Sequence, residues 1–109
     1  NEVVVWGTGT PLREFMHCDD LADALVFMLK TYSDYEHLNV GSGLEISIKN
    51  LAEIISEVVG YNGKIIWDKS KPDGTPRKLM DSSRLTKSGW SNFRTIKDGI
   101  EDTYAEWSQ

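Results

Sequence analysis

Basic residues gather in one stretch of an otherwise acidic chain. Between Lys64 and Arg94 there are eight Lys and Arg against three Asp, a net charge of +5. The other residues contain four basic and fourteen acidic side chains, a net charge of −10. Lys and Arg donate charged hydrogen bonds to phosphate oxygens, so the stretch could bind a phosphate-bearing small molecule. Charge alone favours the simpler interpretation, a solvated loop.

Two glycine pairs resemble the start of a dinucleotide-binding fingerprint. They are Gly7-Thr8-Gly9 and Gly41-Ser42-Gly43. The fingerprint needs a third glycine three residues after the second, and Leu12 and Ile46 stand at those places. No Walker loop is present either, so the chain has no recognisable phosphate-cradling motif of its own.

Three neighbouring residues carry groups that can bind metal or attack a substrate, namely His17, Cys18 and Asp19. Adjacent residues rarely aim at one ion, and only His37 could add a further imidazole, so we expect no zinc site. We expect Cys18 to be a small buried packing residue rather than a nucleophile. The sequence thus predicts no catalytic residue and no metal ligand, and what remains looks like half of a site.

These side chains must be positioned by helices and strands, which the sequence predicts to alternate along the chain. The apolar spacing predicts three main helices: Leu21–Tyr32 behind Asp19 or Asp20 as N-cap, Ile48–Val59 between Ser47 and Gly60, and a helix from Thr95 to Trp107. Asp98 follows Thr95 by three residues, as in a capping box. Short strands are expected at Val3–Trp6, Arg13–His17, His37–Val40 and Lys64–Trp67. This order predicts an α/β or α+β layer structure.

Length and composition limit the classes of protein. The 109 residues, 39% hydrophobic and 27% charged, predict one globular domain with a modest core. A net charge of −5 argues against a non-specific nucleic-acid binder. A single Cys cannot form an internal disulfide and favours a reducing cytosol, and no apolar run reaches the roughly 20 residues of a membrane span. The apolar β-branched start, without Met, suggests a piece of a longer chain.

Four segments resemble a known family. Arg13–Ala24 is similar to the R-x-F/Y-x-H-V-x-D-L/V-A stretch of extended short-chain dehydrogenase/reductases that act on nucleotide sugars, and His37–Gly43 is similar to their N-V/L-G-x-G turn. Val3–Phe15 and Lys71–Asp81 narrow the resemblance to the GDP-L-fucose synthases. That family consists of NADPH-dependent epimerase/reductases acting on GDP-4-keto-6-deoxy-mannose. The resemblance extends over essentially the whole chain, from Val3 to the last helix.

The resemblance implies an α/β fold in which residues 1–109 are the small C-terminal domain that binds the nucleotide sugar. The Rossmann domain, which binds NADPH and carries the family's Gly-rich turn and Tyr-x-x-x-Lys set, would be absent from this chain. The family's epimerising Cys and His also lie upstream, so neither Cys18 nor His17 inherits their role. For the intact enzyme the resemblance implies 3,5-epimerisation followed by 4-reduction, a homodimer and a cytoplasmic location.

The resemblance also suggests substrate-binding residues. Arg13 would hold the GDP diphosphate, for which its planar guanidinium is well shaped; the alternative is an ion pair with Asp19 or Glu14. Trp6 would contact the base or sugar, unless it is a core residue. Asp73 would accept bonds from hydroxyls, unless it only forms the turn before Gly74. Lys78 would add a second positive charge to the diphosphate, and Lys71 and Arg77 are weaker candidates for the same role.

Two alternatives stay open beside this hypothesis. One is a related nucleotide-sugar epimerase or dehydratase with the same fold, and the other is a non-catalytic binding module. For the main hypothesis the partner is the GDP-sugar substrate, and neither nucleic acid nor a membrane is expected. We expect the isolated chain to be inactive, because it lacks the family's reductase and epimerase residues.

Overall fold

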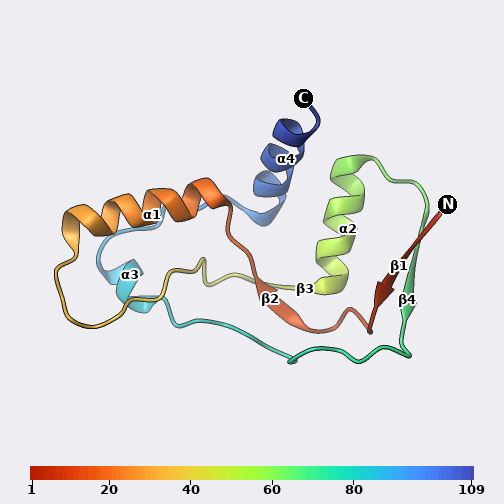
Figure 1. Ribbon diagram of the computed structural model, residues 1–109, viewed down its shortest axis with the longest axis horizontal. Coiled ribbons are helices and arrows are strands. Elements are labelled where there is room, and N and C mark those ends of the chain that lie inside the picture. Colours follow the sequence, from red (N-terminus) through yellow and green to blue (C-terminus); the bar gives the residue numbers. More distant parts are fainter.

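Short strands alternate with helices along the chain. The computed structural model describes residues 1–109 (Figure 1). Its elements in chain order are β1 Glu2–Trp6, β2 Leu12–Glu14, α1 Cys18–Thr31, β3 Glu45–Ser47, α2 Ile48–Val59, β4 Lys64–Asp68, α3 Ser83–Lys87 and α4 Ile96–Trp107. The predicted α/β class and all three main helices are confirmed.

The strands form two separate two-stranded sheets. In the first, β1 and β4 run parallel, with Glu2 opposite Lys64 and Trp6 opposite Asp68. In the second, β2 and β3 run antiparallel, with Arg13 opposite Ile46. β2 ends at Glu14, three residues before the predicted end, because the antiparallel partner β3 begins at Glu45, the residue opposite Glu14.

One predicted strand is wrong, and two short elements were not predicted. Residues 37–40 do not pair with any strand; Leu38 and Val40 pack against the core, and the side chain of Asn39 donates to the carbonyl of Asp81 at 3.2 Å. The strand of that region is β3, five residues later, and α3 is the additional helix. With three and five residues, these elements are too short to show a hydrophobic period.

Side-chain caps begin the three main helices. The predicted caps of α2 and α4 are confirmed: Ser47 Oγ accepts from the Asn50 amide and Thr95 Oγ1 from the Asp98 amide, each at 3.1 Å. The prediction for α1 is wrong, since the cap is His17, whose Nδ1 accepts from the Asp19 amide at 3.1 Å. Imidazole nitrogen can replace the usual hydroxyl or carboxylate oxygen because the helix needs only an acceptor there.

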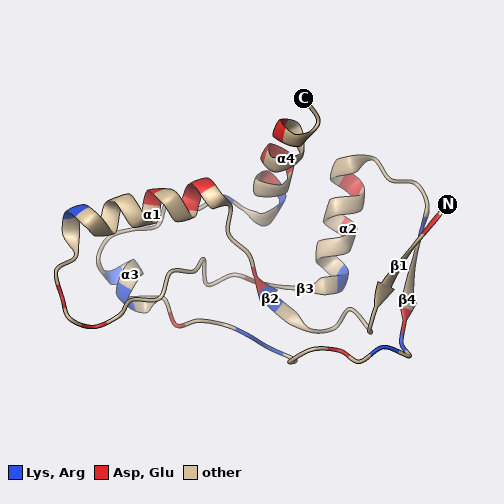
Figure 2. Cartoon of the chain, viewed as in Figure 1, with Lys and Arg blue, Asp and Glu red and all other residues tan.

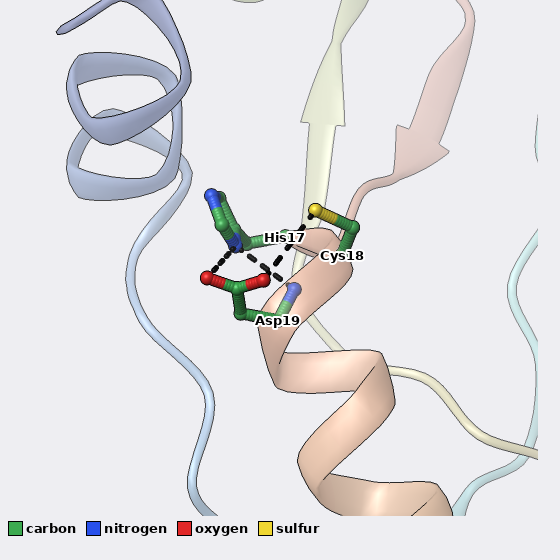
Figure 3. A group of neighbouring side chains, drawn as sticks. All are labelled: His17, Cys18 and Asp19. Atoms are coloured by element: carbon green, nitrogen blue, oxygen red, sulfur yellow. Dashed lines mark hydrogen bonds and ion pairs between the residues drawn. The ribbon is translucent and has the colours of Figure 1, made fainter. Parts of the chain in front are cut away.

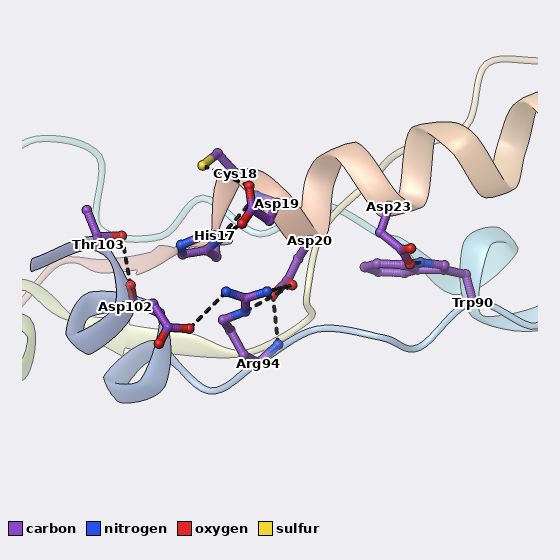
Figure 4. Close-up of polar contacts among 10 residues, drawn as sticks. His17, Cys18, Asp19, Asp20, Asp23, Trp90, Arg94, Asp102 and Thr103 are labelled. Atoms are coloured by element: carbon purple, nitrogen blue, oxygen red, sulfur yellow. Dashed lines mark hydrogen bonds and ion pairs between the residues drawn. The ribbon is translucent and has the colours of Figure 1, made fainter. Parts of the chain in front are cut away.

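The core is smaller than the sequence predicts. Its buried hydrophobic side chains are Ala24 on α1, Leu85 on α3 and Trp90 after it, with a few partly buried neighbours. The Trp90 indole N–H donates to Asp23 Oδ2 of α1 at 2.8 Å, which ties the two parts of this cluster together (Figure 4). α2 packs against α4 and, through its apolar stripe, lies beside β1 and β4.

The molecule is broad and thin. It measures 51 × 35 × 15 Å, and its radius of gyration is 16.6 Å, whereas an ordinary domain of this length has about 13 Å. Only 8 of 109 residues are buried, and Val4, Leu25 and Trp107 are among the large hydrophobic side chains left exposed. Most of the apolar composition is therefore not buried within this chain. None of the helices combines the length and apolar composition needed to cross a membrane.

Candidate functional site

A fully exposed loop carries most of the candidate residues. This basic loop, residues 69–80, leads from β4 along the edge of the molecule toward α3, passing β2 (Figures 1 and 2). It is held at three points along its length. Thr8 binds Asp73, the Leu12 amide donates to the Pro76 carbonyl at 2.9 Å, and Arg77 pairs with a glutamate of β3.

Arg13 and Lys78 lie together, as the sequence predicts. They line one solvent-open cavity of about 350 Å³, which is completed by Glu14, Leu79 and Met80. Arg13 Nη1 donates to the Leu12 carbonyl at 2.7 Å, and neither Arg13 nor Lys78 takes part in any of the five ion pairs that Arg and Lys form in the structure. The alternative of an Arg13 ion pair with Asp19 or Glu14 is not observed. Two cationic groups are thus available for an anion in this cavity.

Arg77, by contrast, is already used within the chain. Its Nε and Nη2 donate to the two carboxylate oxygens of Glu45 at 2.6 and 2.9 Å, and these hydrogen bonds raise the pKa of the guanidinium. This two-pronged ion pair anchors the basic loop to β3. Arg77, a weaker candidate at the outset, is therefore an anchor of the loop in this structure.

Trp6 is not a core residue. It stands at the end of β1 with 71% of its surface exposed, although the three preceding valines predict a buried strand. The Lys71 ammonium lies 5.2 Å from the centroid of the Trp6 ring, a cation–π distance. An exposed indole next to a cation offers a flat apolar surface for a base or sugar ring.

Asp73 is more than a turn former. Its Oδ1 accepts from the Thr8 amide at 2.8 Å and its Oδ2 from the Thr8 hydroxyl at 2.7 Å. The bonds from Thr8, that of the hydroxyl first, lower the pKa of Asp73 because they stabilise its ionised form. The next residue, Gly74, lies against Arg13, whose Nη2 would be 3.0 Å from a Cβ at that position. The loop thus brings Asp73 near Arg13.

Sequence reasoning missed Thr8. The Gly7-Thr8-Gly9 turn resembles the start of a cofactor motif, but in the structure it holds a carboxylate of its own chain. Gly7 and Gly9 have φ of +90° and +79°, and a Cβ on Gly7 would collide with the Asp73 carboxylate. Because the Thr8 amide is taken by Asp73, and no Tyr precedes a Lys by four residues, the residues of this chain do not fit a nicotinamide-dinucleotide site.

The group formed by His17, Cys18 and Asp19 is the one cluster with metal-binding side chains. Their ligand atoms lie within 4.8 Å of one another (Figure 3). His17 Nδ1 is already the acceptor that caps α1, so metal binding there would remove the cap. Cys18 is exposed rather than buried, so our packing prediction is wrong; as the first residue of α1 it lies outside the helix contacts with the core.

Comparison with known proteins adds independent evidence. The model of the NAD dependent epimerase/dehydratase family matches residues 1–41. GDP-L-fucose synthase 1 of Arabidopsis thaliana is 61% identical over 106 residues, which are 97% of this chain and 32% of that protein. GDP-L-fucose synthase of Escherichia coli is 44% identical over 115 aligned residues, 97% of this chain and 36% of that protein. The chain thus spans about a third of these curated relatives.

A solved structure decides the fold. The GDP-mannoheptose C4 reductase of Campylobacter jejuni, solved with NADP bound, superposes with a TM-score of 0.85 at 35% identity, covering 99% of this chain and 35% of that one. This chain has the fold of the C-terminal part of extended short-chain dehydrogenase/reductases. The resemblance read from Val3–Phe15, Arg13–Ala24 and Lys71–Asp81 is confirmed, and the candidate residues lie within this extended reductase fold.

Proposed function

We propose that this chain is the substrate-binding part of a GDP-L-fucose synthase. The full-length enzyme would convert GDP-4-dehydro-6-deoxy-D-mannose to GDP-L-fucose by 3,5-epimerisation and NADPH-dependent 4-reduction. The observation that carries this proposal is the 61% identity to a GDP-L-fucose synthase over nearly the whole chain. Support from geometry comes from Arg13 and Lys78, which share one cavity with Glu14 but take part in no ion pair.

In this proposal, residues 1–109 bind and orient the substrate without reacting with it. Arg13 and Lys78 neutralise the diphosphate, Trp6 lies against a ring of the ligand, and Asp73 accepts bonds from its hydroxyls. Binding energy gained at the nucleotide then holds the sugar in a reactive position, which is how residues remote from the reacting atoms accelerate a reaction. The NADPH site and the reacting residues belong to the rest of the protein in this proposal.

The base of the nucleotide and the reaction can be tested together on the full-length protein that contains this chain. We expect GDP to compete with the substrate at concentrations where UDP has no effect, and we expect NADPH oxidation when GDP-4-keto-6-deoxy-mannose is added. Isothermal titration with GDP and UDP, followed by the spectrophotometric assay, measures both. Equal affinity for the two nucleotides would favour the alternative of a related nucleotide-sugar epimerase or dehydratase.

Trp6 supplies a second test with its own signal. The full-length protein is expected to change its tryptophan fluorescence when GDP-sugar binds, because a ligand ring would cover the exposed indole of Trp6. Trp6→Phe should remove most of that change. Trp107→Phe is the matched control, since Trp107 is also exposed, at 80%, but lies on α4. An unaltered fluorescence change in Trp6→Phe would contradict the contact.

The assembly and location of the full-length enzyme are also part of the proposal. We propose a homodimer in the cytoplasm, supported by the resemblance and by the single Cys. Size-exclusion chromatography with light scattering measures the first, and fractionation of the source cells measures the second.

A further inference from the structure

The Gly7-Thr8-Gly9 turn lies outside the roles assigned so far, although it touches a candidate ligand-binding residue. Thr8 approaches the Asp73 carboxylate with two donors, its amide at 2.8 Å from Oδ1 and its hydroxyl at 2.7 Å from Oδ2. Two bonds to two oxygens fix both the position and the plane of a carboxylate. Each oxygen keeps a further lone pair, which a ligand hydroxyl could use.

Thr8 and Asp73 lie far apart in the sequence, so their hydrogen bonds link the basic loop to the end of β1. Thr8 follows the end of β1 by two residues, whereas Asp73 lies in the basic loop, 65 residues further on. Residues 69–76 form no regular element, and the next anchors of the loop are the Leu12–Pro76 hydrogen bond and the Arg77–Glu45 pair. Between β4 and Pro76, the Thr8–Asp73 pair is therefore the main side-chain link of the loop to the rest of the molecule.

Two other candidate residues lie beside this link. Lys71, two residues before Asp73, is the residue whose ammonium lies over the Trp6 ring. Gly74, the residue after Asp73, lies against the Arg13 guanidinium. Fixing Asp73 thus also fixes the backbone that brings Lys71 to Trp6 and Gly74 to Arg13.

We propose that Thr8 is a positioning residue, which orients the Asp73 carboxylate and holds residues 71–74 of the basic loop against Trp6 and Arg13. This proposal rests on the nucleotide-sugar site proposed above. Thr8 makes no bond to the ligand in it; the hydroxyl acts on binding through Asp73. The hydroxyl also shares a 2.8 Å hydrogen bond with Thr10 Oγ1, which helps to orient it.

The test uses the full-length protein and compares Thr8→Val with Thr8→Ser. Valine keeps the shape and the amide but removes the hydroxyl, whereas serine retains the hydroxyl. We expect Thr8→Val to raise the Kd for GDP-sugar and the KM about three- to tenfold, as for the loss of one hydrogen bond, with little change in kcat. Thr8→Ser should restore binding to within about twofold of the original protein.

A double-mutant cycle separates positioning from general structure. If Thr8 acts through Asp73, Thr8→Val should have almost no further effect on binding in an Asp73→Ala background. Thr103→Val is the matched control, since that hydroxyl bonds the Gly99 carbonyl within α4, and it should leave Kd and KM unchanged. Additive effects of Thr8→Val and Asp73→Ala, or an unchanged Kd in Thr8→Val, would overturn the proposal. Failure of the unmodified protein to bind GDP would instead overturn the proposed function.

Discussion

Arg13→Ala in the full-length protein is expected to weaken GDP binding roughly ten- to a hundredfold, the largest effect that we expect from any change in the site. Hydrogen bonds to charged groups contribute about 1.5–3 kcal/mol, and a tenfold change in Kd corresponds to about 1.4 kcal/mol. Arg13 pairs with no carboxylate of this chain, so its loss leaves no acidic side chain without its counter-ion.

Two variants make the Arg13 experiment specific. Arg13→Lys keeps the charge but loses the two-pronged geometry, so we expect an intermediate Kd. Arg84→Ala removes the same charge from α3, where Arg84 pairs with Glu36 outside the cavity, and it should leave the Kd nearly unchanged. Isothermal titration with GDP measures all three. Equal losses in Arg13→Ala and Arg84→Ala would mean that only the overall charge matters, and would end the diphosphate role of Arg13.

Local signals explain why the helices could be predicted. Ser47 and Thr95 each accept a hydrogen bond from an amide three residues later, so the sequence alone shows where α2 and α4 begin, and Gly60 shows where α2 ends. The cap of α1 cannot be predicted from the sequence in the same way, because His17, Asp19 and Asp20 all carry acceptors near one helix start. Only the fold decides between them: Asp20 is turned inward to meet Arg94, which leaves His17 to cap the helix.

The strands and the site depend on contacts between distant residues. Residues 37–40 have a strand-like composition but no partner, whereas β3 has three unremarkable residues that pair because β2 lies beside them. The resemblance pointed to Arg13 and Lys78, and the structure places them in one cavity. The sequence could not reveal the role of Thr8, because its hydrogen bond to Asp73 joins residues 65 positions apart and no local pattern marks that contact.

The structure also changes how the charge of the basic stretch is understood. Its three arginines are all paired within the chain: Arg77 with Glu45, Arg84 with Glu36, and Arg94 with Asp20 and Asp102. The net charge of +5 therefore overstates the charge offered to a ligand. The cations that remain near the cavity are Arg13, which lies outside the basic stretch in the sequence, and Lys78. Position and pairing, rather than the number of charges, favour an anion site here.

Asp20→Ala is expected to cause the largest loss of stability, about 3 kcal/mol in the free energy of unfolding. Asp20 is only 5% exposed; the Arg94 amide donates to it at 2.8 Å and Nε at 3.1 Å, and Nη2 forms an ion pair with Oδ1 at 3.0 Å (Figure 4). The bonds join the first turn of α1 to the segment that leads into α4. Alanine would leave the amide and a half-buried guanidinium without their acceptor, which is more costly than the loss of an exposed ion pair.

Asp19→Ala is the matched control, because Asp19 is the neighbouring acid in the same first turn and its side chain is 66% exposed. Its loss should lower the free energy of unfolding by about 0.5 kcal/mol, the contribution of an acid near a helix N-terminus. Urea denaturation of the full-length protein, followed by circular dichroism, measures both variants. Since Asp20 lies outside the cavity of Arg13 and Lys78, Asp20→Ala should bind GDP normally wherever it remains folded. Equal stability of the two variants would show that the Asp20–Arg94 link does not hold α4 to α1.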